Sequence, residues 1–239
     1  MLGPIHNAAP VVHHAGMETK VGRRTAFWQH VAHPSRRPHG VRLAVAVMVL
    51  VLTALPVERD RISNLELDVF RWFNTLPDVL DVPLQVIMQL GGCVAVPTVA
   101  VLAVLLARRI RPGLDVVLAG SLAWLAARLI KDAFQRGRPA ALLHDVVLRT
   151  DSGAGFGFVS GHSAVAAALA TVAAFYLPPR VKVLVWVLAG LVGVARMFVG
   201  VHLPLDVAGG LAMGWAIGSL VHFVLLPELT GTAPEQPVE

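Results

Sequence analysis

Residues that could do chemistry gather in three short segments in the second half of the chain. These segments are 131–139 (KDAFQRGRP), 160–162 (SGH) and 196–206 (RMFVGVHLPLD). Each polar residue in them has an ordinary structural explanation when it is taken alone; a serine before a helix, for example, is most often an N-cap. Three strong cations, two histidines and an aspartate in one set are harder to explain in this way. The set therefore points to a shared function.

The cationic residues of this set predict an anion site. Lys131, Arg138 and Arg196 offer positive charge and N–H donors but no acceptors, and the planar guanidinium group suits a phosphate. Ser160 and the amide of Gly161 stand where an apolar helix should begin, and helix N-termini favour phosphate. Because Gly161 has no side chain, an oxyanion can approach its backbone closely.

The two histidines and the aspartate supply what phosphate hydrolysis needs. His202 stands four residues before Asp206, so the carboxylate can hold one ring nitrogen while the other nitrogen attacks phosphorus. The same spacing also fits a simple helix pair. His162 is then free to protonate the leaving group. The set holds no cluster of carboxylates that suggests a metal site, so we expect neither a metal nor another cofactor.

The elements that must position these residues are membrane helices. The chain is 56% hydrophobic and 15% charged, whereas soluble domains are about 45–50% apolar and about 25% charged. The sequence contains six apolar runs, each of which can form a span of about 20 residues. Gly91, Gly92 and Pro97 interrupt the second run, which predicts a kink or a short interfacial helix there. The runs are 41–57, 84–107, 114–130, 163–177, 181–199 and 207–226.

The fold class that follows is all-α, a bundle of six transmembrane helices over residues 41–227. We expect residues 1–40 to be a disordered, basic cytoplasmic tail and residues 228–239 to be a second cytoplasmic tail. The net charge of +5 need not indicate nucleic acid as a partner, because the orientation of a membrane protein depends on where its basic residues lie. The sequence does not indicate an oligomeric state.

The segment between the first two runs (SNLELDVFRWFNTLP) predicts one further helix. Ser63 and Glu66 have the spacing of a capping box. The apolar residues that follow fall on one helical face: Leu65, Val69, Trp72, Phe73 and Leu76. An amphipathic helix in the membrane interface fits this pattern, and so does an ordinary helix packed on the bundle.

The basic residues predict the orientation of the bundle. In a six-span count, three segments rich in lysine and arginine fall on one side of the membrane, which the positive-inside rule assigns to the cytoplasm. They are Lys20, Arg23, Arg24, Arg36, Arg37 and Arg42; Arg108, Arg109 and Arg111; and Arg180 and Lys182. Both termini are then cytoplasmic, and all three chemical segments lie at the outer face of the cell membrane.

The three segments together resemble the signature of the type 2 phosphatidic acid phosphatase superfamily, which reads K-x6-R-P, P-S-G-H and S-R-x5-H-x3-D. Lys131 and Arg138-Pro139 match the first element in full. Val159 replaces the proline of the second element, and Ala195 replaces the serine of the third. The other matching positions are Ser160, Gly161 and His162 in the second element, and Arg196, His202 and Asp206 in the third.

The resemblance implies a metal-independent phosphatase with a phosphohistidine intermediate on His202 and with His162 as the general acid. It implies a phosphate cradle made of Lys131, Arg138, Ser160, Gly161 and Arg196. Val159 is expected to alter the turn that enters the fourth span. Ala195 removes a hydroxyl group, and losing one neutral hydrogen bond, worth about 1 kcal/mol, would slow such an enzyme rather than abolish it.

The position of the site predicts a lipid substrate. A cationic site at headgroup level, with room for a tail between helices, suits a lipid phosphate. A polyprenyl diphosphate is favoured, because a carrier lipid exposes its phosphate at the outer face after glycan transfer in cell wall biogenesis. Phosphatidylglycerophosphate, phosphatidate and prenyl-phosphosugars are the alternatives. The loop 140–158 is expected to help choose among them.

Two interpretations from other classes stay open at this point. One is a lipid transporter or scramblase that uses the same anion site, in which case lipid movement would survive the loss of His202. The other is a catalytically weakened homologue that only binds its ligand.

Overall fold

In the computed structural model of the chain, residues 37–57, 62–150 and 154–222 are described, and all of them belong to one compact unit, Arg36–Glu239. The expected tail 228–239 lies outside the described residues, and so does the expected tail 1–40 except for its last four positions. Those positions belong to the first described helix, which begins at Arg37 rather than near residue 41.

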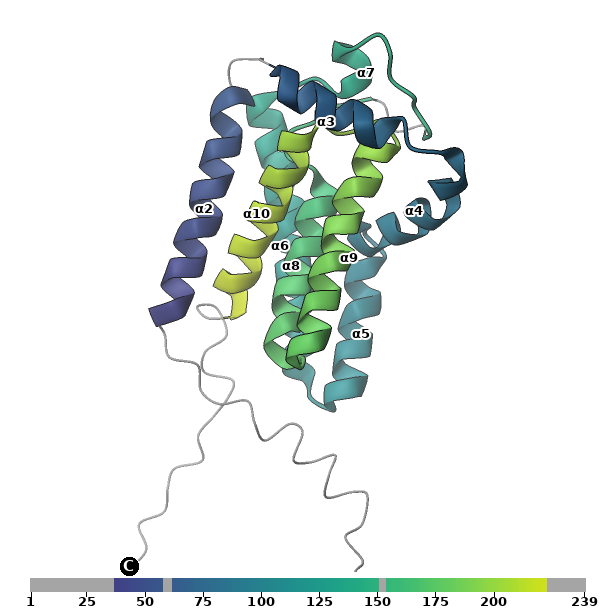
Figure 1. Cartoon of the computed structure of the whole chain (residues 1–239). Coiled ribbons are helices and arrows are strands. Elements are labelled where there is room, and N and C mark those ends of the chain that lie inside the picture. Colours follow the sequence, from purple (N-terminus) through teal and green to yellow (C-terminus); the bar gives the residue numbers. More distant parts are fainter. Residues whose placement is uncertain (1–36, 58–61, 151–153, 223–239) are drawn as a thin grey trace, which may run out of the picture. The chain divides into compact units, whose positions relative to one another are not determined.

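The described residues form helices joined by turns and loops (Figure 1). A helix lies over each of the six apolar runs, and shorter helices lie between the runs. The helices are α2 (Arg37–Val57), α3 (Asn64–Asn74), η1 (Asp78–Leu80), α4 (Asp81–Met88), η2 (Gln89–Gly91), α5 (Ala95–Ala107), α6 (Ile110–Phe134), α7 (Pro139–Leu142), α8 (Gly161–Tyr176), α9 (Pro179–Phe198) and α10 (Pro204–Leu220).

Three of these helices are long and apolar enough to cross a membrane alone, over Gly40–Val57, Ile110–Phe134 and Pro179–Phe198. The segments Asp78–Gly91 and Ala95–Ala107, bent by 71°, make a fourth span if they are counted together. The bend falls at the interruption that the glycine pair predicts. Within the described residues the count is thus three or four, and the six-span topology stays a prediction.

Helix α8 explains part of this difference. It is apolar but only 16 residues long, and every residue from Ser163 to Val172 is buried. It packs against α6, α9 and α10, so its surroundings are protein. On α10, Gly214 faces α8 so closely that a Cβ atom there would collide with the carbonyl of Ala164. Small residues at such contacts let membrane helices approach closely.

Helix α3 lies across the ends of α9 and α10 (Figure 1). Ser63 is its N-cap and accepts a hydrogen bond from the amide of Glu66 at 3.1 Å. The face on the bundle is made of Glu66, Phe70 and Asn74, all buried. On the opposite side Leu65 and Trp72 are 74% and 64% exposed. The helix is therefore present and packed, and its place in the membrane interface stays a prediction.

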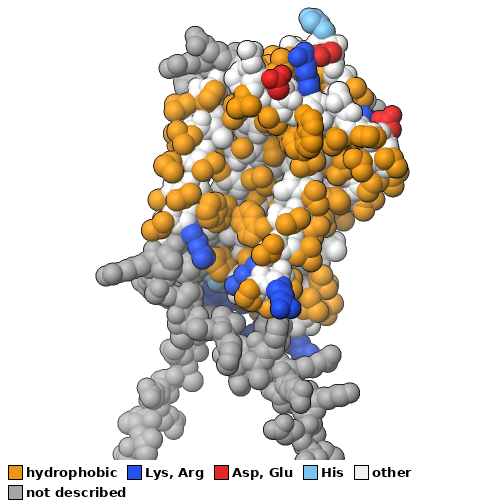
Figure 2. Space-filling view, in the orientation of Figure 1, with side chains coloured by type: hydrophobic (Ala, Val, Ile, Leu, Met, Phe, Trp, Pro, Cys, Tyr) orange, Lys and Arg blue, Asp and Glu red, His pale blue; other side chains and the backbone are white. Residues whose placement is uncertain are grey.

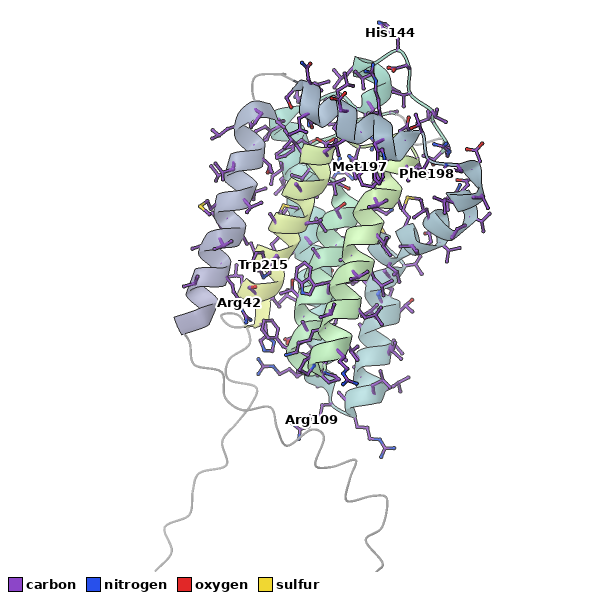
Figure 3. The ribbon with its side chains drawn as sticks, viewed as in Figure 1. Arg42, Arg109, His144, Met197, Phe198 and Trp215 are labelled. Atoms are coloured by element: carbon purple, nitrogen blue, oxygen red, sulfur yellow. The ribbon has the colours of Figure 1, made fainter. Side chains whose placement is uncertain are left out.

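The surface of the bundle is apolar along its sides and charged at its two ends. Figure 2 shows apolar side chains over the sides of the helices, with lysine and arginine at one end and a mixture of charges at the other. Arg42 and Arg109 lie at the first end, and His144 lies at the second (Figure 3). Figure 3 thus places these two basic residues at the end opposite to α3 and α7.

Candidate active site

The three chemical segments meet at the end of the bundle beneath α3. Segment 131–139 follows from α6, residues 160–162 begin α8, and segment 196–206 joins α9 to α10. Hydrogen bonds tie them together: the amide of Ser160 donates to the carbonyl of Asp206 at 2.8 Å, and Lys131 Nζ donates to the carbonyls of Phe156 and Gly157 at 2.6 and 3.1 Å. The folding of the bundle thus brings distant parts of the sequence to one place.

His202 and Asp206 are both buried at the start of α10, with exposures of 2% and 0%. Asp206 lies in the first turn, where its Oδ2 accepts the amide of Leu203 at 2.9 Å. The Nδ1 of His202 is 3.5 Å from the same Oδ2, which is longer than an ordinary hydrogen bond. The two side chains are therefore neighbours with a gap of a few tenths of an ångström to close.

The environment of His202 favours the neutral imidazole. Burial, and then the positive charges of Arg196, Lys131 and Arg138, hold its pKa well below the usual value of 6.5. A neutral ring keeps the lone pair that a nucleophile needs. The positive charges of all three cations thus act on the ring of His202.

Two of the cations carry buried N–H groups without an acceptor. Arg138 Nε reaches the carbonyl of Phe156 at 3.5 Å, and Arg196 Nη1 contacts Met88 Sδ at 3.0 Å. Arg138 Nη1 and Arg196 Nε are buried and have no hydrogen-bond partner in the part of the chain that the structure describes. Buried donors without partners are costly, so this end of the bundle lacks acceptors that an anion would supply.

Ser160 and Gly161 occupy the first positions of α8. Ser160 is its N-cap, and its hydroxyl oxygen accepts from the amide and the hydroxyl of Ser163 at 3.4 and 3.0 Å. The ordinary capping role is therefore real, and it leaves the proton of the Ser160 hydroxyl for another acceptor. A Cβ atom at Gly161 would meet Ala127 Cβ at 3.7 Å, an ordinary contact. Packing alone does not require glycine there, which leaves the approach of a ligand as a reason.

His162 follows in the same turn and is half-buried. Its backbone carbonyl is so close to Gly91, at the bend before α5, that a Cβ atom on Gly91 would collide with it. The position of His162 thus depends on the bent segment as well as on α8. A positive charge on His162 would lower the pKa of His202 further.

A buried ion network behind Asp206 is the main feature that sequence reasoning missed. Arg136 Nη1 donates to Asp206 Oδ1 at 2.8 Å, and Arg136 Nη2 donates to Glu66 Oε2 at 2.9 Å. Glu66 was expected to complete a capping box with Ser63; instead its side chain turns inward to a charged partner. One sign of this role was present in the sequence: Arg136 is an additional arginine within segment 131–139.

The electrostatics of this network keep Arg136 charged. Burial alone would lower its pKa, but the hydrogen bond to Glu66 and the negative charges of Asp206 and Glu66 raise the pKa above its ordinary value. The guanidinium group is therefore a permanent cation between two carboxylates.

The loop between α7 and α8 is fixed at both of its described ends. Gly157 donates its amide to the carbonyl of Arg136 at 2.7 Å. Asn74 exchanges two hydrogen bonds with the backbone of Val147, each 2.9 Å long, and Arg149 pairs with Asp78 at 2.9 Å. The described parts of the loop are thus held to neighbouring segments, and the role of the loop in substrate choice stays a prediction.

The two departures from the resemblance pattern lie in apolar surroundings. Val159 and Ala195 are both fully buried. Ala195 packs with Leu84 and Phe198 in one apolar cluster. As for metals, the described residues contain no group of three or more histidine, cysteine, aspartate or glutamate side chains that could hold an ion.

Comparisons with known proteins identify the family of the chain. The family model of the PAP2 superfamily matches residues 112–227. The crystal structure of LpxE from Aquifex aeolicus is 31% identical, with a TM-score of 0.59, over 67% of this chain and 96% of that one. Phosphatidylglycerophosphatase B from Bacillus subtilis (strain 168) is 34% identical over 109 residues, which are 41% of this chain and 50% of that protein. The match therefore spans half the length of this relative.

A second solved structure supports the fold alone. It is the first transmembrane PAP2 type phosphatidylglycerolphosphate phosphatase from Bacillus subtilis, 23% identical, with a TM-score of 0.58, over 74% of this chain and 94% of that one. The helices that are long and apolar enough to cross a membrane support a membrane protein.

Proposed function

Because this chain belongs to the PAP2 superfamily, we propose that it is a lipid phosphatase that hydrolyses a phosphomonoester or a diphosphate at the extracytoplasmic face. One observation carries the proposal: Arg138 and Arg196 have buried N–H groups without partners, and the charges of the same two residues act on the buried His202. A phosphate supplies the acceptors that these groups lack, and it places phosphorus beside a nucleophile.

The first chemical step forms a phosphohistidine. Nε2 of His202 attacks phosphorus while Asp206 faces Nδ1, the nitrogen on its side of the ring. The bond between phosphorus and the oxygen of the leaving group breaks, and protonated His162 gives that oxygen its proton. Asp206 stabilises the positive charge that the ring gains. Burial and the charges of Arg196, Arg138 and Lys131 lower the pKa of His162 to about 4, so the negative charge of the bound phosphate must raise this pKa for the step.

The second step releases phosphate. Neutral His162 now accepts a proton from water, and the resulting hydroxide attacks phosphorus. The bond between phosphorus and Nε2 breaks, and His202 returns to its neutral state. His162 regains the proton that it gave up, so the cycle closes without a metal or another cofactor.

The charge clamp replaces a metal in this mechanism. Lys131, Arg138 and Arg196 neutralise the negative charge on the phosphoryl oxygens, and such preorganised electrostatic stabilisation is often the largest single contribution to catalysis. The hydroxyl of Ser160 and the amide of Gly161 complete the cradle at the positive end of the α8 dipole.

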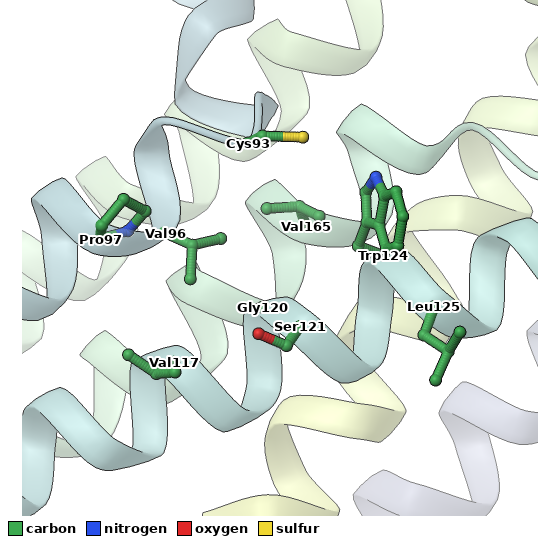
Figure 4. A pocket seen from close by; sticks show the side chains of 9 residues that line it. All are labelled: Cys93, Val96, Pro97, Val117, Gly120, Ser121, Trp124, Leu125 and Val165. Atoms are coloured by element: carbon green, nitrogen blue, oxygen red, sulfur yellow. The ribbon is translucent and has the colours of Figure 1, made fainter.

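A groove beside α5, α6 and α8 suits the tail of a lipid. It has a volume of about 640 Å³ (Figure 4). Its lining is mainly apolar: Cys93, Val96, Pro97, Val117, Gly120, Ser121, Trp124, Leu125 and Val165. Val165 lies one helical turn after His162 on α8, so the groove starts close to the reacting centre.

The chain's single cysteine allows a test of this groove, because Cys93 is exposed within it. A bulky maleimide on Cys93 should slow hydrolysis of a long-chain lipid phosphate several-fold and leave hydrolysis of a short, soluble phosphate ester unchanged. The Cys93→Ser variant treated in the same way is the control. Equal slowing of both substrates in the labelled wild type would place the tail elsewhere.

Among lipids, a polyprenyl diphosphate is favoured, because the proposed outward orientation suits a carrier lipid. The basic residues support that orientation: Arg42 and Arg109 lie at the end opposite the site (Figure 3), which leaves the site extracytoplasmic and both termini cytoplasmic. A second candidate substrate is phosphatidylglycerophosphate, which the names of the two Bacillus subtilis relatives favour.

The test is phosphate release by the purified full chain from a panel of lipid phosphates. The panel holds a polyprenyl diphosphate, phosphatidylglycerophosphate, phosphatidate and a prenyl-phosphosugar. We expect release from at least one lipid and none from His202→Ala, which should still bind inorganic phosphate. Lipid movement across vesicles without phosphate release, retained in His202→Ala, would support a transporter instead.

A further inference from the structure

The ion network behind Asp206 contains two residues to which the mechanism above gives no role. Glu66, Arg136 and Asp206 are 4%, 1% and 0% exposed. Arg136 bridges the carboxylates with bonds of 2.9 Å to Glu66 and 2.8 Å to Asp206. One positive and two negative charges are thus removed from solvent together, at a high desolvation cost.

The remaining oxygens of the two carboxylates are also used. Glu66 Oε1 accepts the amide of Leu205 at 3.2 Å, and Asp206 Oδ2 accepts the amide of Leu203 at 2.9 Å. Both amides belong to the start of α10, where backbone N–H groups have no partner within the helix. The network therefore fixes the first turn of α10, which begins two residues after His202.

The contacts of Asp206 decide which of its oxygens faces His202. Arg136 holds Oδ1, so Oδ2 is the oxygen left 3.5 Å from Nδ1 of the ring. Without Arg136 the carboxylate would keep only the amide of Leu203 on Oδ2, and the bond that holds Oδ1 away from the ring would be lost. Because Glu66 shares the charge of Arg136, Asp206 also keeps more of its negative charge for His202.

The packing around the network makes these bonds stronger and less mobile. Phe70, Leu203 and Val207 form a buried apolar cluster at the same place, and hydrogen bonds are electrostatically stronger in such surroundings. Glu66 and Phe70 come from α3, whose other face is exposed. The network is thus the point at which α3 is tied to the start of α10.

We propose that Arg136 and Glu66 are positioning residues for the nucleophile: Arg136 orients the carboxylate of Asp206 toward His202, and Glu66 fixes Arg136. The proposal rests on the proposed function, because it assigns these residues a role in the same reaction. Neither residue touches the substrate, so both should act on the rate of the chemical step and leave phosphate binding intact.

The test compares single and double variants of the purified full chain. Arg136→Lys keeps the charge but loses the two-armed bridge, and we expect a roughly tenfold to hundredfold lower kcat with KM within about twofold, as small displacements of reacting groups can cost. Glu66→Gln should lower kcat by less, because its amide oxygen can still accept the amide of Leu205. Binding of inorganic phosphate should not change in either variant.

Coupling to Asp206 separates positioning from a merely structural role. In an Asp206→Asn background, Arg136→Lys should lower kcat by less than about a further twofold. The reason is that the Asp206 carboxylate, through which Arg136 acts, is already lost. Arg71→Gln is the matched control on α3: it removes an exposed ion pair with Asp145 and should leave kcat unchanged.

Each outcome decides between the possibilities. One result is an active wild type in which Arg136→Lys leaves kcat unchanged, or lowers kcat by the same factor in the wild-type and Asp206→Asn backgrounds. Either form of this result shows that the positioning role is wrong, and the proposed function stands. Wild type that releases phosphate from no lipid of the panel overturns both. If Arg136→Lys does not fold, Glu66→Gln, which alters a single charge, undergoes the same comparison in the two backgrounds.

Discussion

Both ends of the bundle contain a buried aspartate beside a histidine and an arginine, but the two ends differ in what is left unpaired. At the end opposite the site, Asp115 accepts from the hydroxyl of Tyr176 at 2.6 Å and lies 2.9 Å from Nδ1 of His222. Arg111 lies 4.0 Å from the same carboxylate. There, one buried donor atom of Arg111 and one buried acceptor atom of Asp115 lack partners.

At the end that holds the site, the buried atoms without partners in the described part of the chain are Nη1 of Arg138, Nε of Arg196 and Nδ1 of His202, and the two guanidinium atoms can only donate. Lys131, Arg138 and Arg196 form no ion pair with a carboxylate among the described residues. Buried ionisable residues therefore do not by themselves mark a site. An excess of donors over acceptors does, because only a ligand with acceptors can correct it.

The aspartates give the largest contrast between the two ends. Asp206→Asn should lower kcat on the order of a thousandfold, because the amide can no longer stabilise the charged ring of His202. Asp115→Asn should change kcat less than twofold and should lower the midpoint of thermal unfolding. Steady-state phosphate release and a melting curve of each variant make the comparison. Similar kcat losses in both would break the distinction between the ends.

The arginines should differ by a smaller factor. Arg138→Gln removes a cation that has no carboxylate partner, and we expect kcat to fall roughly a hundredfold, as when one donor to a developing anion is lost. Arg111→Gln, at the other end, should leave turnover within twofold. A weaker affinity for inorganic phosphate should accompany the first variant alone. Unchanged phosphate affinity in Arg138→Gln would exclude this residue from the cradle.

The smallest expected effect is that of a chelator. If the unpaired cations at the end that holds the site neutralise the phosphate, turnover should be unchanged after dialysis against a strong chelator of divalent ions. The measurement is the rate of phosphate release before and after chelation, with added magnesium as the control. Loss of turnover that a divalent ion restores would contradict the charge clamp.

Local patterns in the sequence predict most of the helices. Apolar runs mark the helices because a span must be apolar along its length, and the interruption at Gly91 and Gly92 marks the bend before α5. The ends and lengths of the helices were harder to predict. Helix α2 begins at Arg37, and α8 is only 16 residues long.

The site shows the same division between local and distant information. The four-residue spacing of His202 and Asp206 predicts that the two side chains act together. The position of Ser160 predicts an N-cap, which the structure confirms. The bond from Arg136 to Glu66 joins residues 70 positions apart, and the bond from Leu205 to Glu66 joins residues 139 apart. No local pattern encodes such contacts, and the local pattern at Ser63 suggested a different partner for Glu66.

The most direct test of the proposed mechanism is to trap the phosphohistidine. Rapid acid-free quenching of the full chain with a lipid whose phosphate is radiolabelled should leave label on the protein, and peptide mapping should place it on His202. The adduct should be labile to acid and stable to base, and it should be absent from His202→Ala. Turnover without protein-bound label at any time, or label on another residue, would contradict the central claim.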